Sequence, residues 1–205
     1  QNMTIRPGSI SQVVFTSASQ ALIAGQPSSA YTIQTRDLYG NISDAMANIT
    51  IRLSSSSPAG RFSDADTGPW TVTGIMMAVN TNTSTFYYRD TLAGVPVITC
   101  TEFPDLNWAD AVQAQTVLAG SVTKVSFTSA VQTVIASESS SAMTAQTTDA
   151  YGNISNASQD VEVTLSSTST AGAFGLSNSG AWNLPSIIVY TGTNNTTFYY
   201  RDTLM

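Results

Sequence analysis

The clearest alternation of apolar and polar residues lies in the segment NITIRLS. Ile49, Ile51 and Leu53 are separated by polar residues, and successive side chains of a strand point to opposite faces. This spacing predicts a strand with these three side chains turned toward a core. A second segment keeps the same phase, at Val161, Val163 and Leu165. Only the inward set stays apolar in both, so burial fixes the pattern.

Further short segments rich in Val, Ile, Thr, Tyr and Phe, bounded by Gly, Asn, Pro and Ser/Thr turns, predict more strands. They lie at about residues 11–18, 29–36, 73–79, 84–91, 95–101 and 112–118, with later equivalents where they exist. No segment has a helical period of useful length. About seven short strands in about 110 residues predict an antiparallel β-sandwich of immunoglobulin type, with an up-and-down barrel as the alternative.

The whole pattern occurs twice. TFYYRDTL stands at Thr85–Leu92 and again at Thr197–Leu204, and Phe15 aligns with Phe127 at the same offset of 112 residues. About half of the aligned positions are identical, which is typical of a tandem duplication. The predicted fold class is therefore all-β, with two tandem immunoglobulin-like antiparallel β-sandwich domains.

The alignment predicts a first domain at residues 8–118 and a second at 119–205 that lacks its last strands. Residues 1–7 align with the closing strand of a preceding repeat, because TIRPGSI matches TVLAGSV. An unfinished sandwich exposes its core and an unpaired sheet edge.

Two expectations follow for the open second domain. In one, the chain belongs to a longer array and the next residues complete the sandwich. In the other, subunits complete one another head to tail by strand addition, with an assembly strand formed by Asn2, Met3, Thr4, Ile5 and Arg6. The second expectation predicts filaments that resist mild denaturant, and a folded monomer would exclude it.

Composition limits the function. Charged residues make up 10% of the chain, and the net charge is −6. Lys124 and the six arginines are scattered along the sequence, so it lacks the clustered basic residues with which a protein binds nucleic acid. There is no His, which excludes Ser-His-Asp and Cys-His catalysis and His-containing zinc sites. We expect no enzyme activity and no cofactor. No apolar run approaches the roughly 18 residues of a membrane span.

Asn-X-Ser/Thr sequons predict covalent N-glycans in an exporting cell that has the machinery. Two pairs recur at equivalent positions in predicted turns. The candidates are Asn2, Asn41, Asn48, Asn82, Asn153, Asn156, Asn194 and Asn195.

The shared D-x-Y-G-N-I-S motif, beginning at Asp37 and Asp149, is interpreted as a turn rather than a calcium site, because each copy has one acid. Asp64 and Asp66 have a spacing that calcium sites use. The second copy has no acid there, so we expect no metal. Cys100 alternates with Ile98 and is expected in the core, with a reactive or intermolecular thiol as the alternative.

The pairs Arg89/Asp90 and Arg201/Asp202 are interpreted as structural, since neighbours on a strand point apart. We expect one member of each to pair across strands, with the turn Asp37 or Asp149 as the partner.

The tryptophans are expected to pack at a sandwich edge, with a sugar-binding platform as the alternative, at Trp70, Trp108 and Trp182. Lys124 is the only Lys, which excludes an isopeptide cross-link in the first domain and disfavours one in the second.

The motifs F-x-S-A-x-Q, Q-T-x-D-x-Y-G-N, L-S-S-x-S-x-A-G-x-F and F-Y-Y-R-D-T-L-A-G-x-P-x-I-T together resemble the Ig-like repeats of large prokaryotic surface proteins. These include S-layer and filament proteins and the invasin/intimin-type bacterial Ig-like domains. The resemblance implies a rod-like stalk or wall component at the cell surface, with no shared catalytic residue. We therefore expect a structural subunit of an extracellular filament, S-layer or stalk whose partners are copies of itself. The alternative is an adhesin that binds a glycan or protein through loops such as residues 54–70.

Overall fold

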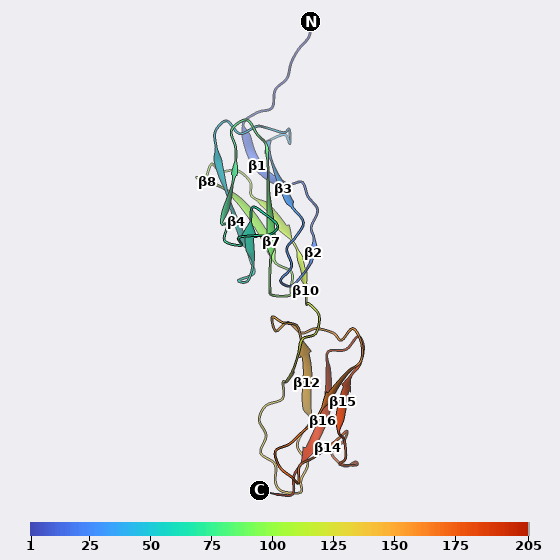
Figure 1. The fold of residues 1–205 in the computed structure, drawn as a ribbon. Coiled ribbons are helices and arrows are strands. Elements are labelled where there is room, and N and C mark those ends of the chain that lie inside the picture. Colours follow the sequence, from blue (N-terminus) through green and yellow to red (C-terminus); the bar gives the residue numbers. More distant parts are fainter. Residues whose placement is uncertain (205) are drawn as a thin grey trace. The chain divides into compact units, whose positions relative to one another are not determined.

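The computed structural model describes residues 1–204 and divides into two compact units, Gln1–Leu118 (unit 1) and the residues from Ala119 onward (unit 2). Both units consist of strands, turns and irregular segments (Figure 1). The described residues form no helix, and hence none long and apolar enough to cross a membrane.

Unit 1 is a sandwich of two four-stranded sheets with orders β1-β3-β7-β5 and β6-β4-β8-β9, plus a parallel pair β10-β2. Side chains from both large sheets form one apolar cluster, which confirms the predicted sandwich rather than a barrel. The strands are β1 (Ile10–Phe15), β2 (Ala21–Ile23), β3 (Tyr31–Asp37), β4 (Ile49–Ser55), β5 (Arg61–Ser63), β6 (Gly74–Met77), β7 (Thr83–Arg89), β8 (Val97–Phe103), β9 (Ala111–Ala114) and β10 (Thr116–Leu118).

The core of unit 1 contains the apolar residues that the alternation predicted to face inward. Ile51 and Leu53 are buried on β4, and Ile98 and Cys100 are buried opposite them on β8. Burial raises the pKa of the Cys100 thiol to about 12, which keeps it protonated and inert at neutral pH. The expectation of a core cysteine is confirmed.

The segment predicted as one strand at 112–118 is two strands that join different sheets. It breaks at the buried Gln115, whose Oε1 accepts hydrogen bonds from the Gln20 N–H at 2.7 Å and the Tyr31 hydroxyl at 2.7 Å. Its own N–H donates to the carbonyl of Pro96 at 2.8 Å. At Gln115 the chain therefore stops pairing with β8, through β9, and starts pairing with β2, through β10.

Unit 2 repeats part of this plan. The order β11-β12-β16-β14 matches β1-β3-β7-β5, and the antiparallel pair β13-β15 matches β4-β6. Among the described residues of unit 2, no segment takes the places of β8, β9 and β10, and residues 133–135, equivalent to β2, form no strand. The strands are β11 (Lys124–Phe127), β12 (Met143–Thr148), β13 (Val161–Thr164), β14 (Ala173–Gly175), β15 (Ser186–Val189) and β16 (Asn195–Arg201).

Candidate functional site

The repeated TFYYRDTL segments form β7 and β16 and the turn after each. In unit 1 the Tyr88 hydroxyl donates to Asp90 Oδ2 at 2.6 Å and lies 2.8 Å from Ser55 Oγ. A Cβ added to Gly60 would lie 2.6 Å from the Tyr88 hydroxyl, so the cluster also requires a glycine. The same contacts recur in unit 2 between Tyr200, Asp202, Ser167 and Gly172. The identical residues of the two copies thus hold one structural cluster together.

Arg89 and Arg201 do not pair with the turn carboxylates, so that expectation is wrong. Each guanidinium lies over an indole ring, Arg89 at 4.9 Å from the centroid of Trp70 and Arg201 at 4.8 Å from that of Trp182. Delocalised charge over an aromatic face is a favourable contact that needs no carboxylate. Both indoles are half-buried, as expected for packing at an edge, and Trp108 packs against the core of unit 1.

The predicted turn at Asp37 is confirmed, with Gly40 at a φ of 83°. Asp37 Oδ1 accepts the N–H groups of Tyr39 and Asn41, each at 2.9 Å, and Oδ2 accepts that of Gly8 at 2.8 Å. The Asn41 side-chain amide also donates to Oδ2 at 3.0 Å. The Asn41 amide, followed by the Gly8 N–H, lowers the pKa of Asp37 to about 2.

The equivalent carboxylate in unit 2 is also held as an anion. Burial alone would raise the pKa of Asp149, but hydrogen bonds from the Asn153 amide and the Gly120 N–H lower it overall. The turn is therefore a carboxylate stabilised by N–H donors in both copies, which is a structural role.

Acid is expected to destabilise both units through these turns. The pKa of Asp37 is lower in the folded chain than its ordinary value of 3.8, so the folded state binds fewer protons than the unfolded state. The stabilisation is therefore complete above about pH 4 and is lost as the pH falls toward 2. Thermal unfolding measured from pH 5 to pH 2 should show this loss, and Asp37→Asn should flatten it for unit 1. The exposed Asp64→Asn is the control, and an unchanged pH dependence in Asp37→Asn would contradict the assignment.

The sequon asparagines differ in what their amides do. Asn41 and Asn153 donate from Nδ2 to the turn carboxylates, and Asn153 is only 8% exposed. Asn82 and Asn194 donate to Asp44 and Asn156, respectively. The exposed sequon asparagines outside these positions are Asn2, Asn48, Asn156 and Asn195.

Asp64 and Asp66 are exposed in the loop after β5. The part of the chain that the structure describes contains no group of three or more His, Cys, Asp or Glu residues placed to hold a metal. Lys124 is exposed on β11, where its Nζ lies 3.5 Å from the carbonyl of Ala150.

In unit 1 a groove beside β2 is filled by β10. Val117 pairs with Leu22, and both are buried. The pairing is parallel and is tied by the Thr116 N–H to the carbonyl of Gln20 at 3.0 Å and the Ala24 N–H to that of Leu118 at 2.8 Å. One strand of three residues therefore closes the sandwich at this point.

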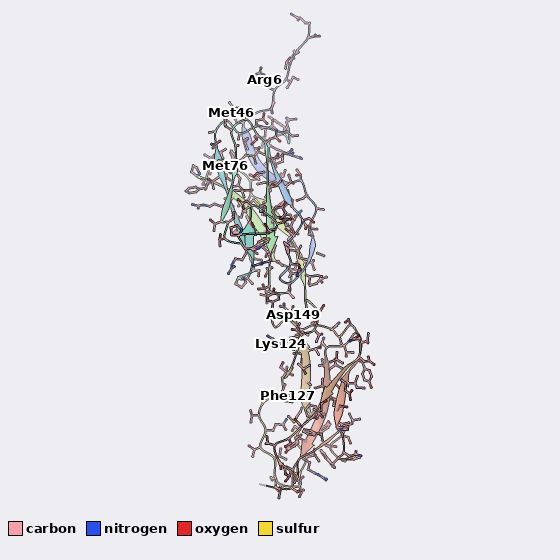
Figure 2. The ribbon with its side chains drawn as sticks, in the orientation of Figure 1. Arg6, Met46, Met76, Lys124, Phe127 and Asp149 are labelled. Atoms are coloured by element: carbon pink, nitrogen blue, oxygen red, sulfur yellow. The ribbon has the colours of Figure 1, made fainter. Side chains whose placement is uncertain are left out.

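The equivalent groove of unit 2, which we call the acceptor groove, is open. It is a cavity of about 470 Å³ whose lining includes Phe127, Val131, Gln132, Val134 and Met143. Phe127, labelled in Figure 2, is 61% exposed. Gln132 and Met143 stand at the positions of Gln20 and Tyr31, the two residues that hold Gln115 in unit 1. The acceptor groove thus has the place of β10 and no occupant among the described residues.

A second open region of unit 2 lies along β13. In unit 1, β4 is bonded on both sides, to β6 and β8, whereas the described part of unit 2 pairs β13 only with β15. Leu165 is half-buried although its equivalent Leu53 is buried. Val125 on β11 is 40% exposed, against 1% for its equivalent Val13, whose N–H bonds to Ala109 beside β9.

The N-terminal segment Asn2–Arg6 aligns with the end of β9 and with β10 of unit 1. Gly8 is held by the Asp37 turn, and the residues before it run away from unit 1 in an extended form (Figure 1; Arg6 is labelled in Figure 2). Met3 and Ile5 are each 87% exposed and align with Gln115 and Val117. The exposed segment is therefore a counterpart of β10 with its inward side chains in water.

Comparisons with known proteins give no match to a protein-family model and none to a curated protein. Among solved structures, the chain is similar to domains 4–9 of the surface layer protein SbsC, with 14% identity and a TM-score of 0.37. That match covers 97% of this chain and 28% of SbsC domains 4–9. Domains 5–6 of the same S-layer protein match with 14% identity and a TM-score of 0.38, over 96% of this chain and 85% of that one.

The adhesin FdeC of Escherichia coli is similar with 15% identity and a TM-score of 0.42, over 95% of this chain and 58% of that one. The chain thus spans about a quarter of the first of these structures and somewhat more than half of the adhesin. S-layer proteins and adhesins are the classes of surface protein that the sequence motifs resemble. At these identities and TM-scores, each similarity is remote and assigns no activity to this chain.

Proposed function

We propose that the protein is a structural subunit of an extracellular filament, S-layer or stalk that assembles head to tail by strand donation. The N-terminal segment Asn2–Arg6 of one copy occupies the acceptor groove of the next and there adopts the place of β10. The observation that carries this proposal is the pair of exposed apolar side chains, Met3 and Ile5, at the positions that close the groove in unit 1.

The alternation of apolar and polar residues in Asn2–Arg6 supports a strand with Met3 and Ile5 facing the acceptor groove. Val117 and Gln115 face inward in unit 1, while the residues between and beside them are exposed. In the donated strand, Met3 and Ile5 would therefore point into the groove, and the polar Asn2, Thr4 and Arg6 toward water. A peptide strand added to an open sheet gains main-chain hydrogen bonds together with burial of alternate side chains.

The surface supports an extracellular setting. Only 10% of residues are charged, and sequons stand on exposed asparagines in both units. We propose N-glycans at Asn2, Asn48, Asn156 or Asn195, since the amides of Asn41 and Asn153 serve the turn carboxylates. Glycan on hydroxyl-rich sandwiches would add solubility without charge.

The decisive experiment places one charge on either the inward or the outward face of the donated strand. Ile5→Asp puts a carboxylate into the acceptor groove, where burial of an unpaired charge is strongly unfavourable. We expect the wild-type chain to form filaments or head-to-tail oligomers in electron microscopy and sedimentation, and Ile5→Asp to remain monomeric. The matched control is Thr4→Asp, which has the same charge on the outward face and should assemble.

Two outcomes would overturn the proposal. A wild-type chain that is folded yet monomeric at high concentration would exclude strand donation. Equal assembly by Ile5→Asp and the wild type would mean that another surface joins the subunits.

Adhesion is the second candidate, favoured by one observation. A hollow of about 470 Å³ beside Trp70 in unit 1 recurs as one of about 360 Å³ beside Trp182 in unit 2. Aromatic rings beside a hollow are a common platform for sugars. Binding in a glycan or cell-surface screen that is lost on Trp70→Ala would favour this function.

A further inference from the structure

A buried polar pair closes the groove of unit 1. The Tyr31 hydroxyl donates to Gln115 Oε1 at 2.7 Å, and both side chains are almost completely buried. Gln115 has further partners, because its Oε1 also accepts the Gln20 N–H and its Nε2 donates to Gln113 Oε1 at 2.9 Å. The Tyr31 hydroxyl bonds to Gln115, so an apolar residue at position 115 would leave this buried hydroxyl without its acceptor.

Both positions change together at the acceptor groove. The equivalent of Tyr31 is Met143, which lines the groove, and the equivalent of Gln115 on the N-terminal segment is Met3. Two unbranched thioether side chains can fill the same space without any hydrogen bond. The Gln132 N–H is equivalent to that of Gln20, which donates to Gln115 in unit 1, and a thioether is a weak acceptor for such a donor.

We propose that Met3 of one copy packs against Met143 of a second copy, and that this pair selects the acceptor groove over the groove of unit 1. The inference rests on the proposed strand donation and deepens it by naming the partner and the contact. The register follows that of β10 on β2, so Thr4, Ile5 and Arg6 lie beside Thr133, Val134 and Ile135.

The pair explains why donation goes to a second copy rather than to unit 1. In the groove of unit 1, Met3 would displace Gln115 and leave the Tyr31 hydroxyl buried with no acceptor. At the acceptor groove, Met3 meets Met143 and no hydroxyl is stranded. In this proposal the N-terminal segment is therefore matched to unit 2 by its chemistry.

The test exchanges the apolar pair for the polar pair of unit 1. Met143→Tyr places a hydroxyl against Met3 with no strong acceptor and should raise the critical concentration for assembly by about tenfold to a hundredfold. Met3→Gln alone should have a smaller effect, because its Oε1 could accept the Gln132 N–H as Gln115 accepts that of Gln20. The double variant recreates the Tyr–Gln pair and should return close to the wild-type value. Met3→Leu is the apolar control and should assemble nearly normally.

The outcomes separate this inference from the proposed function. Assembly that depends on Ile5 but shows no rescue in the double variant, or no effect of either single variant, overturns the Met3–Met143 contact alone. A wild-type chain that does not assemble overturns both.

A cross-link supplies a second measurement that does not depend on Met143→Tyr folding. Partners across a strand pair lie within the Cα range of a disulfide, so Thr4→Cys combined with Thr133→Cys should give a ladder of disulfide-linked oligomers on oxidation. Thr4→Cys with Ile135→Cys, which is out of register, should give none. A ladder only in the second variant would overturn the register.

Discussion

A chain extended after Met205 by a copy of residues 94–118, with Met in place of Gln115, is expected to be monomeric. Its unit 2 is expected to unfold at a higher temperature than unit 2 of the original chain. The extension supplies equivalents of β8, β9 and β10 to unit 2. It would pair the free edge of β13, cover Leu165 and Val125, and fill the acceptor groove. Covering large apolar side chains contributes about 1.5–3 kcal/mol each when burial is complete.

The expected increase in the unfolding temperature of unit 2 is large for so short an extension. Several kcal/mol in a domain of this size correspond to an increase of more than about 10 °C in the unfolding temperature of unit 2. Hydrogen exchange read separately for the two units would detect it, because unit 1 should be unchanged. An extension of equal length and scrambled sequence is the control. Continued head-to-tail assembly of the extended chain would contradict donation into the acceptor groove.

Phe86→Ala is expected to destabilise unit 1 by about 3–5 kcal/mol, because it empties the centre of an aromatic cluster. The Phe86 ring is fully buried and stacks on Tyr31 at 5.5 Å between centroids. It also meets Phe62 edge-on at 5.9 Å and Phe15 at 6.2 Å. Removing it therefore loses burial and three ring contacts at once.

The adjacent residue on the same strand provides the control. Tyr87 points to the other face of β7 and is only half-buried, so Tyr87→Ala should cost much less. Urea unfolding followed by hydrogen exchange would assign each loss to unit 1. A loss below about 1 kcal/mol for Phe86→Ala would contradict the described core.

Much of the fold follows from local pattern. The alternation at Ile49–Leu53 and the duplication of 112 residues predicted β4 and the sandwich, because a period of two and a repeat are visible in one sequence. The strands β2 and β5 were not predicted, because each has only three residues and depends on its partner strand rather than on the strand propensity of its own residues. The break at Gln115 also depends on tertiary partners, namely Gln20 and Tyr31.

The site was less predictable than the fold. The alignment predicts that the N-terminal segment is equivalent to β10, but the role that we propose for Met3 depends on Met143, which lies far away in the chain. The pairing expected for Arg89 was wrong because a nearby carboxylate was assumed, whereas the structure offers Trp70. The simultaneous change from Tyr31 and Gln115 to Met143 and Met3 was a signal available in the alignment of the two copies.

The exposed position of Met3 makes the free subunit sensitive to oxidants. A methionine in water is readily converted to its sulfoxide, which is polar and would no longer suit an apolar groove. Once donated, the same sulfur would be shielded by the neighbouring subunit. In strand-donation assemblies, oxidised chains would therefore be excluded from growth, while subunits already incorporated would keep their thioether.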